Sequence, residues 1–111
     1  MRRVLVDFDG TIIKKAPDGK FRMHNGAKAA LDQMKANGYE IIIFTSRCAD
    51  SENRNAKENT AVIHNYLTKN KIPHDRITAE KISADYYIDD KAIRFVGNWD
   101  HVMEKINGQN V

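Results

Sequence analysis

Hydrophobic positions along the chain form short apolar runs separated by longer amphipathic stretches. The runs at residues 4–6, 39–44 and 84–88 predict strands that are buried on both faces, as in a parallel sheet. Residues 75–78 predict a weaker strand, and residues 93–96 predict a short strand at the edge of the sheet. The apolar pattern therefore predicts a sheet with several short, mainly buried strands.

Between these runs, apolar residues recur at helical spacing. The first helix is predicted to begin after Asn25 as its N-cap and to end at Gly38, which suits the left-handed capping position. A second helix is predicted over residues 56–70, after a polar loop at 48–55, and a third around Trp99 to Ile106. Strands that alternate with helices favour a layered α/β fold with a mainly parallel sheet, here in a single domain over residues 1–111.

The stretch from residue 12 to residue 23 connects the first strand to the first helix. Pro17, Asp18 and Gly19 form a strong turn signal, so residues 12–13 and 21–23 are expected to pair as a short hairpin. The stretch is basic, with Lys14, Lys15, Lys20 and Arg22. It is interpreted either as a solvated loop or as a flap beside a site.

Composition excludes some classes of protein. The 111 residues are 41% hydrophobic and 30% charged, with a formal net charge of +3, and no apolar run is long enough to span a bilayer. The acidic Asp7 and Asp9 interrupt the first apolar segment, which argues against a targeting signal. A lone cysteine, Cys48, favours a reducing compartment, so a cytoplasmic protein that does not contact membranes is expected.

Polar side chains follow three of the predicted strands. These strand ends carry, in order, Asp7 and Asp9, then Thr45 and Ser46, then Asp89 and Asp90. Because ligands bind outside the carboxyl ends of the strands in open α/β sheets, the polar groups are expected to converge. Clustered carboxylates require a hard cation, and Mg²⁺ prefers such oxygen ligands. The four histidines, His24, His64, His74 and His101, are scattered and lack zinc spacing.

The residue types suit phosphoryl transfer. A carboxylate beside Mg²⁺ can attack phosphorus, and a second carboxylate two positions on can act as acid and base. A lysine and small hydroxyl groups can orient the phosphoryl oxygens; Lys81 and Thr45 are the first candidates, with Lys91 and Ser46 as their rivals. Arg47 is open to two interpretations, a bidentate ligand of a substrate phosphate or a surface residue.

The same residues occur in the order of the four motifs of the haloacid dehalogenase superfamily, which the chain resembles along its whole length. The first motif is matched by Asp7-Phe8-Asp9-Gly10-Thr11, the second by Thr45 or Ser46, the third by Lys81 and the fourth by Asp89-Asp90. The resemblance implies that Asp7 is the nucleophile and Asp9 the general acid and base. It also implies that Mg²⁺ is held by the Asp7 side chain, the Asp9 backbone carbonyl and Asp89, assisted by Asp90. Gly10, Thr11, Ser46 and Arg47 are the candidate substrate-binding residues.

The resemblance also implies a three-layer Rossmann-like fold with the Asp7 strand in the centre of the sheet, between the strands that precede Thr45 and Asp89. The intervals between motifs are too short for a cap domain, so a small capless member is expected. Its site would be open, or covered by the residue 12–23 flap, a neighbouring subunit or a large substrate.

The expected function is a magnesium-dependent phosphomonoesterase that works through an aspartyl phosphate on Asp7. The expected partner is a small phosphorylated metabolite, nucleotide or sugar phosphate. The first alternative is a polynucleotide-end (3′) phosphatase, which an open site and a basic flap would suit. The second is a non-catalytic module that binds phosphate or metal.

Overall fold

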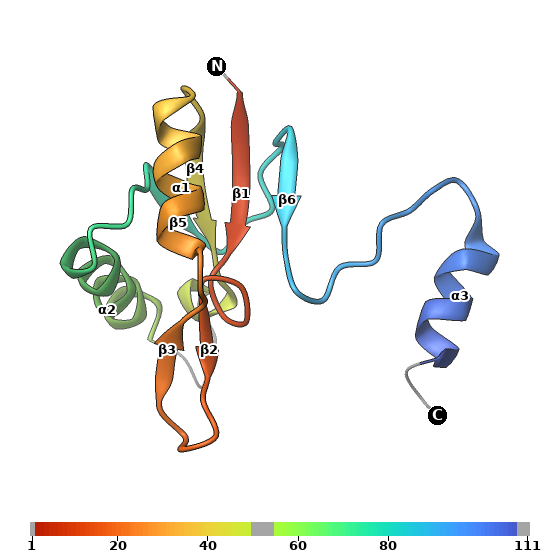
Figure 1. Ribbon diagram of the computed structural model, residues 1–111, viewed down its shortest axis with the longest axis horizontal. Coiled ribbons are helices and arrows are strands. Elements are labelled where there is room, and N and C mark those ends of the chain that lie inside the picture. Colours follow the sequence, from red (N-terminus) through yellow and green to blue (C-terminus); the bar gives the residue numbers. More distant parts are fainter. Residues whose placement is uncertain (1, 50–54, 109–111) are drawn as a thin grey trace.

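A four-stranded parallel sheet forms the centre of the computed structural model, which describes residues 2–49 and 55–108. The sheet contains β1 (Arg3–Asp7), β4 (Glu40–Phe44), β5 (Arg76–Thr78) and β6 (Tyr86–Ile88), in the order β5-β4-β1-β6 (Figure 1). The predicted α/β class with a mainly parallel sheet is confirmed. The predicted interior place of β1, between β4 and β6, is also confirmed.

Two helices cover one face of this sheet. α1 (Ala27–Ala36) joins β1 to β4, and α2 (Ala56–Lys69) joins β4 to β5. Both connections move the chain in the same direction across the sheet, so right-handed crossovers place both helices on the same side. The main core lies between these layers and contains Val4, Val6, Ile41 and Ile43 from the strands and Leu31, Ile63 and Leu67 from the helices.

The connection from β5 to β6 runs back across the sheet and lies against its other face. Leu5 and Tyr87 are register partners, so their side chains share that face, opposite the Val4 and Val6 side chains. The Tyr87 hydroxyl donates to the Ile82 carbonyl at 2.9 Å, which places the connection on the same side. Leu5 is buried there although neither α1 nor α2 lies on that face.

The third helix, α3 (Trp99–Gly108), stands away from the sheet at the end of an extended segment (Figure 1). The described residues therefore form two layers of helix and sheet rather than the expected three. The prediction of a strand at residues 93–96 is wrong, because this part of the segment leads away from the sheet and pairs with no strand of the described chain. Phe95 and Val96 are consequently exposed.

The predicted hairpin is present between β1 and α1. β2 (Ile13–Lys15) and β3 (Phe21–Met23) pair antiparallel, and the hairpin projects past the carboxyl end of β1 (Figure 1). Between Asp9 and β4 the chain thus forms this hairpin and α1.

The ends of the helices differ partly from the prediction. Gly26, not Asn25, is the N-cap of α1; it has φ 85° and makes no side-chain cap hydrogen bond. Gly38 closes α1 at φ 86°, as predicted. Residues 46–48 form a short 3₁₀ helix, η1 (Ser46–Cys48), and Asn55 caps α2. Residues 50–54 of the predicted polar loop lie outside the described residues. Among the helices described, none is long and apolar enough to cross a membrane.

Candidate active site

The carboxyl ends of β1 and β6 bring three aspartates together. Asp7 is the last residue of β1, and Asp89 and Asp90 directly follow β6. One carboxylate oxygen from each of the three lies within 4.8 Å of the other two. The register of the parallel strands explains this convergence. Val6 of β1 pairs with Ile88 of β6, and after these residues both strands end at the same edge of the sheet. The sequence-based expectation that these acids meet is confirmed.

The environment of Asp7 disfavours its negative charge. Burial, together with the charge of Asp89 and the proximity of Asp90, raises the pKa of Asp7 from 3.8 to about 6, although a hydrogen bond from Thr11 partly opposes this. That bond runs from Thr11 Oγ1 to Asp7 Oδ2 and measures 3.2 Å. A divalent cation would remove the repulsion among the three acids. Three carboxylates at an exposed edge offer oxygen ligands with room for water, which fits Mg²⁺.

Gly10 makes room for this acidic cluster. Its backbone has φ 86°, and its N–H donates to the Ile13 carbonyl at 2.7 Å. A Cβ at this position would overlap the carboxylate of Asp90. The glycine therefore serves both the turn after β1 and the approach of Asp90 to Asp7.

The second carboxylate of the first motif has a different partner. Arg47 Nε donates to Asp9 Oδ2 at 2.9 Å, and Arg47 Nη2 donates to Asp9 Oδ1 at 2.5 Å. This bidentate pair holds the Asp9 side chain away from the three-aspartate group. From its position in the sequence, Arg47 was predicted only as a ligand of a substrate phosphate or as a surface residue, and the pair with Asp9 was not predicted. Its place after β4, which lies beside β1, was the one available signal.

Thr45 and Ser46 are placed differently. The Thr45 side chain is 1% exposed, and its Oγ1 accepts from the Arg47 N–H at 3.2 Å. Asn59 on α2 adds a hydrogen bond to the Arg47 carbonyl at 2.9 Å. Thr45 thus shapes the turn that carries Arg47, whereas Ser46 is exposed. Which of the two contacts a phosphate stays a prediction.

The two lysine candidates for the third motif lie at the periphery. Lys81 Nζ is 5.3 Å from the centroid of the Tyr87 ring. The Lys91 backbone N–H donates to Asp89 Oδ1 at 2.8 Å, and its side chain is exposed. Within residues 2–49 and 55–108, neither ammonium forms an ion pair with the aspartates of the site. The assignment of Lys81 therefore stays a prediction.

A hollow of about 390 Å³ adjoins the acidic cluster. Thr11, Asp89 and Asp90 form one side of it, and the first turn of α1 with the preceding His24 and Asn25 forms the other. The cluster is thus open to ligands from solvent rather than enclosed.

Fold and site together define an α/β protein with a carboxylate cluster at the carboxyl edge of a parallel sheet. No protein-family profile matches the chain. No curated protein matches it either. The chain is similar to a solved structure described as a conserved protein from Bacteroides thetaiotaomicron, with a TM-score of 0.61 and 16% sequence identity, over 98% of this chain and 92% of that one. At this identity the similarity shows a shared fold.

Proposed function

We infer that the protein is a magnesium-dependent phosphomonoesterase of the haloacid dehalogenase type, with Asp7 as its nucleophile. The observation that carries this proposal is the approach of Asp7, Asp89 and Asp90 within 4.8 Å at the end of an interior strand. Such a cluster is unfavourable without a cation, and Asp9 lies two residues further on with a different partner. The two acids of the first motif are therefore already separated into two environments, as two different roles require.

Asp7, Asp89 and Asp90 would hold the Mg²⁺, which supplies charge neutralisation for the phosphoryl oxygens. The Asp7 carboxylate attacks phosphorus, and the bond from phosphorus to the leaving oxygen breaks. Asp9, in its protonated form, gives a proton to that oxygen, so an alcohol leaves and an aspartyl phosphate remains. Asp9 then takes a proton from water, which attacks the phosphorus and releases phosphate and Asp7.

The test uses an aryl phosphate and the purified full-length chain, with Mg²⁺ or with a chelator. Turnover is expected only with Mg²⁺. The variant Asp7→Asn is expected to lower kcat by about 10³-fold or more, because the nucleophile is removed. Mass spectrometry of acid-quenched protein is expected to find a phosphoryl group on the wild type and none on the variant.

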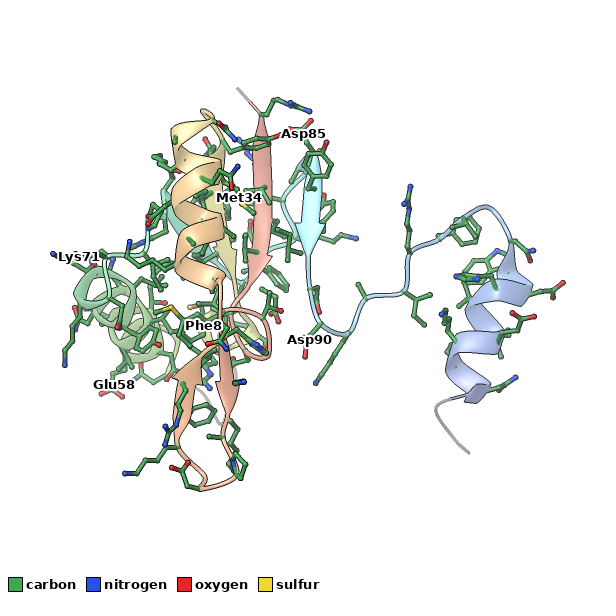
Figure 2. All side chains as sticks on the ribbon, in the orientation of Figure 1. Phe8, Met34, Glu58, Lys71, Asp85 and Asp90 are labelled. Carbon is green, nitrogen blue, oxygen red and sulfur yellow. The ribbon has the colours of Figure 1, made fainter. Side chains whose placement is uncertain are left out.

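Asp85→Asn is the matched control, because Asp85 lies at the opposite end of β6 from Asp90 (Figure 2). There Asp85 Oδ2 accepts from the Arg3 N–H at 2.7 Å, and an asparagine can keep this bond. The control is expected to retain turnover. Chelator-resistant turnover, or no turnover of any phosphomonoester in a broad panel, would reject the proposed function. In the latter case, a rise of the thermal midpoint with Mg²⁺ that Asp7→Asn removes would identify a binding module.

A further inference from the structure

The hairpin places an aromatic ring beside the candidate site. Phe21 pairs with Lys15 across the hairpin, and Ile13 pairs with Met23 two positions along. These four side chains share one face of the hairpin, and Ile13 and Met23 pack against the core. That face is therefore turned toward the body of the protein. Phe21 nevertheless keeps 56% of its surface exposed, so its ring lies at a rim rather than in the core.

This ring is linked through Arg47 to Asp9, the candidate acid and base. The Arg47 guanidinium carbon lies 5.6 Å from the centroid of the Phe21 ring. The same guanidinium makes the bidentate pair with Asp9. The backbone of Arg47 is fixed by Thr45 and Asn59. Phe21, Arg47 and Asp9 thus form a row that leads from the reacting acid to an exposed aromatic surface.

The position of this row indicates where a leaving group extends. In the proposed function, on which this inference rests, Asp9 gives its proton to the leaving oxygen, so that oxygen must lie beside Asp9. The body of the leaving group is therefore directed past Arg47 toward Phe21 and its neighbour Lys15.

We propose that the substrate is a nucleoside phosphomonoester whose base stacks on Phe21, whether as a free nucleotide or as the end of an oligonucleotide. An exposed aromatic ring is a sequence-tolerant stacking surface for a nucleobase. Lys15, which pairs with Phe21 across the hairpin, supplies positive charge beside the ring for an anionic substrate. A phosphorylated polyol or sugar offers no planar group to this surface.

The test compares kcat/KM for nucleoside monophosphates and a terminally phosphorylated oligonucleotide with kcat/KM for glycerol phosphate. The wild type is expected to prefer at least one of the two nucleoside substrates to glycerol phosphate. The preferred one identifies whether the substrate is a free nucleotide or the end of an oligonucleotide. Phe21→Ala is expected to lower the ratio of nucleoside to glycerol phosphate turnover by about 5- to 150-fold, the range for loss of one stacked base. Phe21→Trp is expected to restore that ratio.

Phe95→Ala is the matched control, because Phe95 is similarly exposed, at 53%, but lies on the segment that leads away from the sheet. It is expected to leave the ratio unchanged. An equal loss for all substrates in Phe21→Ala would overturn the proposal, since Phe21 would then only position Arg47. A wild type that turns over glycerol phosphate as well as nucleotides would also overturn it. No turnover of any substrate with Mg²⁺ would instead reject the phosphomonoesterase function itself.

Discussion

Gly10 is the residue on which the geometry of the acidic cluster depends most directly. It combines a left-handed backbone with close contact to the Asp90 carboxylate. Any L side chain would be strained by the backbone and would also push Asp90 away from Asp7. A side chain at position 10 would therefore have two effects, backbone strain and displacement of Asp90. Only the displacement of Asp90 changes the acidic cluster.

Replacing Gly10 by alanine is accordingly expected to remove most of the Mg²⁺-dependent turnover, because Asp90 must move. The measurements are kcat with saturating substrate and the shift in thermal midpoint that Mg²⁺ produces. Gly38→Ala is the control for backbone strain, since Gly38 has the same φ of 86° but no atom within 4 Å of an added Cβ. Equal effects of the two substitutions on turnover would show that strain alone, and not displacement of Asp90, disables the protein.

At the scale of secondary-structure elements, Asp75 connects α1, β4 and β5. One of its oxygens accepts from Lys35 in the last turn of α1 at 2.5 Å, and the other accepts from the Ile41 N–H of β4 at 2.8 Å. Burial acts to raise the pKa of Asp75, but the bonds from Lys35 and Ile41 and the Lys35 charge outweigh it, so the pKa is lowered. Asp75 directly precedes β5, and the carboxylate therefore fixes the start of the edge strand against its neighbours.

A lowered pKa means that the ionised form of Asp75 stabilises the fold. This contribution is complete above the ordinary aspartate pKa of about 4 and is lost as the pH falls through the lowered value. Asp75→Asn is expected to reduce the free energy of unfolding by about 1 kcal/mol at pH 7, because the side chains of Asp75 and Lys35 are partly exposed to solvent. The deficit relative to the wild type should shrink in acid, as measured by urea unfolding at several pH values.

Asp32→Asn is the comparison for this prediction, because within the described residues the ion pair of Asp32 is with Lys28, one turn away on α1. Its effect is expected to be within about 0.5 kcal/mol. A deficit for Asp75→Asn that does not change with pH would show that the carboxylate acts through shape and not through charge.

The sequence predicted the elements that have a strong local pattern. The apolar runs located β1, β4 and β6, and helical spacing located α1, α2 and α3 within a few residues. Residues 93–96 had an apolar pattern but no pairing partner, and pairing depends on where the whole segment lies, which local pattern does not determine. The N-cap of α1 is Gly26 and not the predicted Asn25, because the backbone conformation of Gly26, rather than the Asn25 side chain, begins the helix.

The candidate site was also predictable only in part. Strand order and parallel register bring Asp7, Asp89 and Asp90 together, and their positions after predicted parallel strands indicated this. The Arg47–Asp9 pair depends on side-chain directions after two different strands, so residue spacing could not reveal it. The approach of Phe21 to Arg47 likewise requires the direction of the hairpin.

The whole molecule is less compact than its length suggests. Its radius of gyration is 15.4 Å, whereas about 13 Å is typical of a compact chain of this size. The difference reflects α3, which lies apart from the sheet and leaves Trp99, Met103 and Ile106 exposed. The stability of the sheet and of α1 and α2 is therefore expected to depend little on α3.

Trp99→Ala tests this expectation, because the Trp99 side chain is 71% exposed. It should change the free energy of unfolding by less than about 0.5 kcal/mol, as for a surface residue away from the core. Leu67→Ala, in the core between α2 and the sheet, should cost about 2–5 kcal/mol. A cost for Trp99→Ala that approaches the value for Leu67→Ala would show that α3 packs on the body of the protein in solution.

The strand order also has a consequence for synthesis on the ribosome. β1 emerges first but requires β6, one of the last strands to emerge, to complete its pairing on one side. The part of the chain up to β5 can already bury the core between the sheet and its two helices. Asp7 therefore lacks Asp89 and Asp90 until β6 has emerged. A nascent chain can acquire most of this fold before the acidic cluster exists, so metal binding would arise only after β6 has emerged.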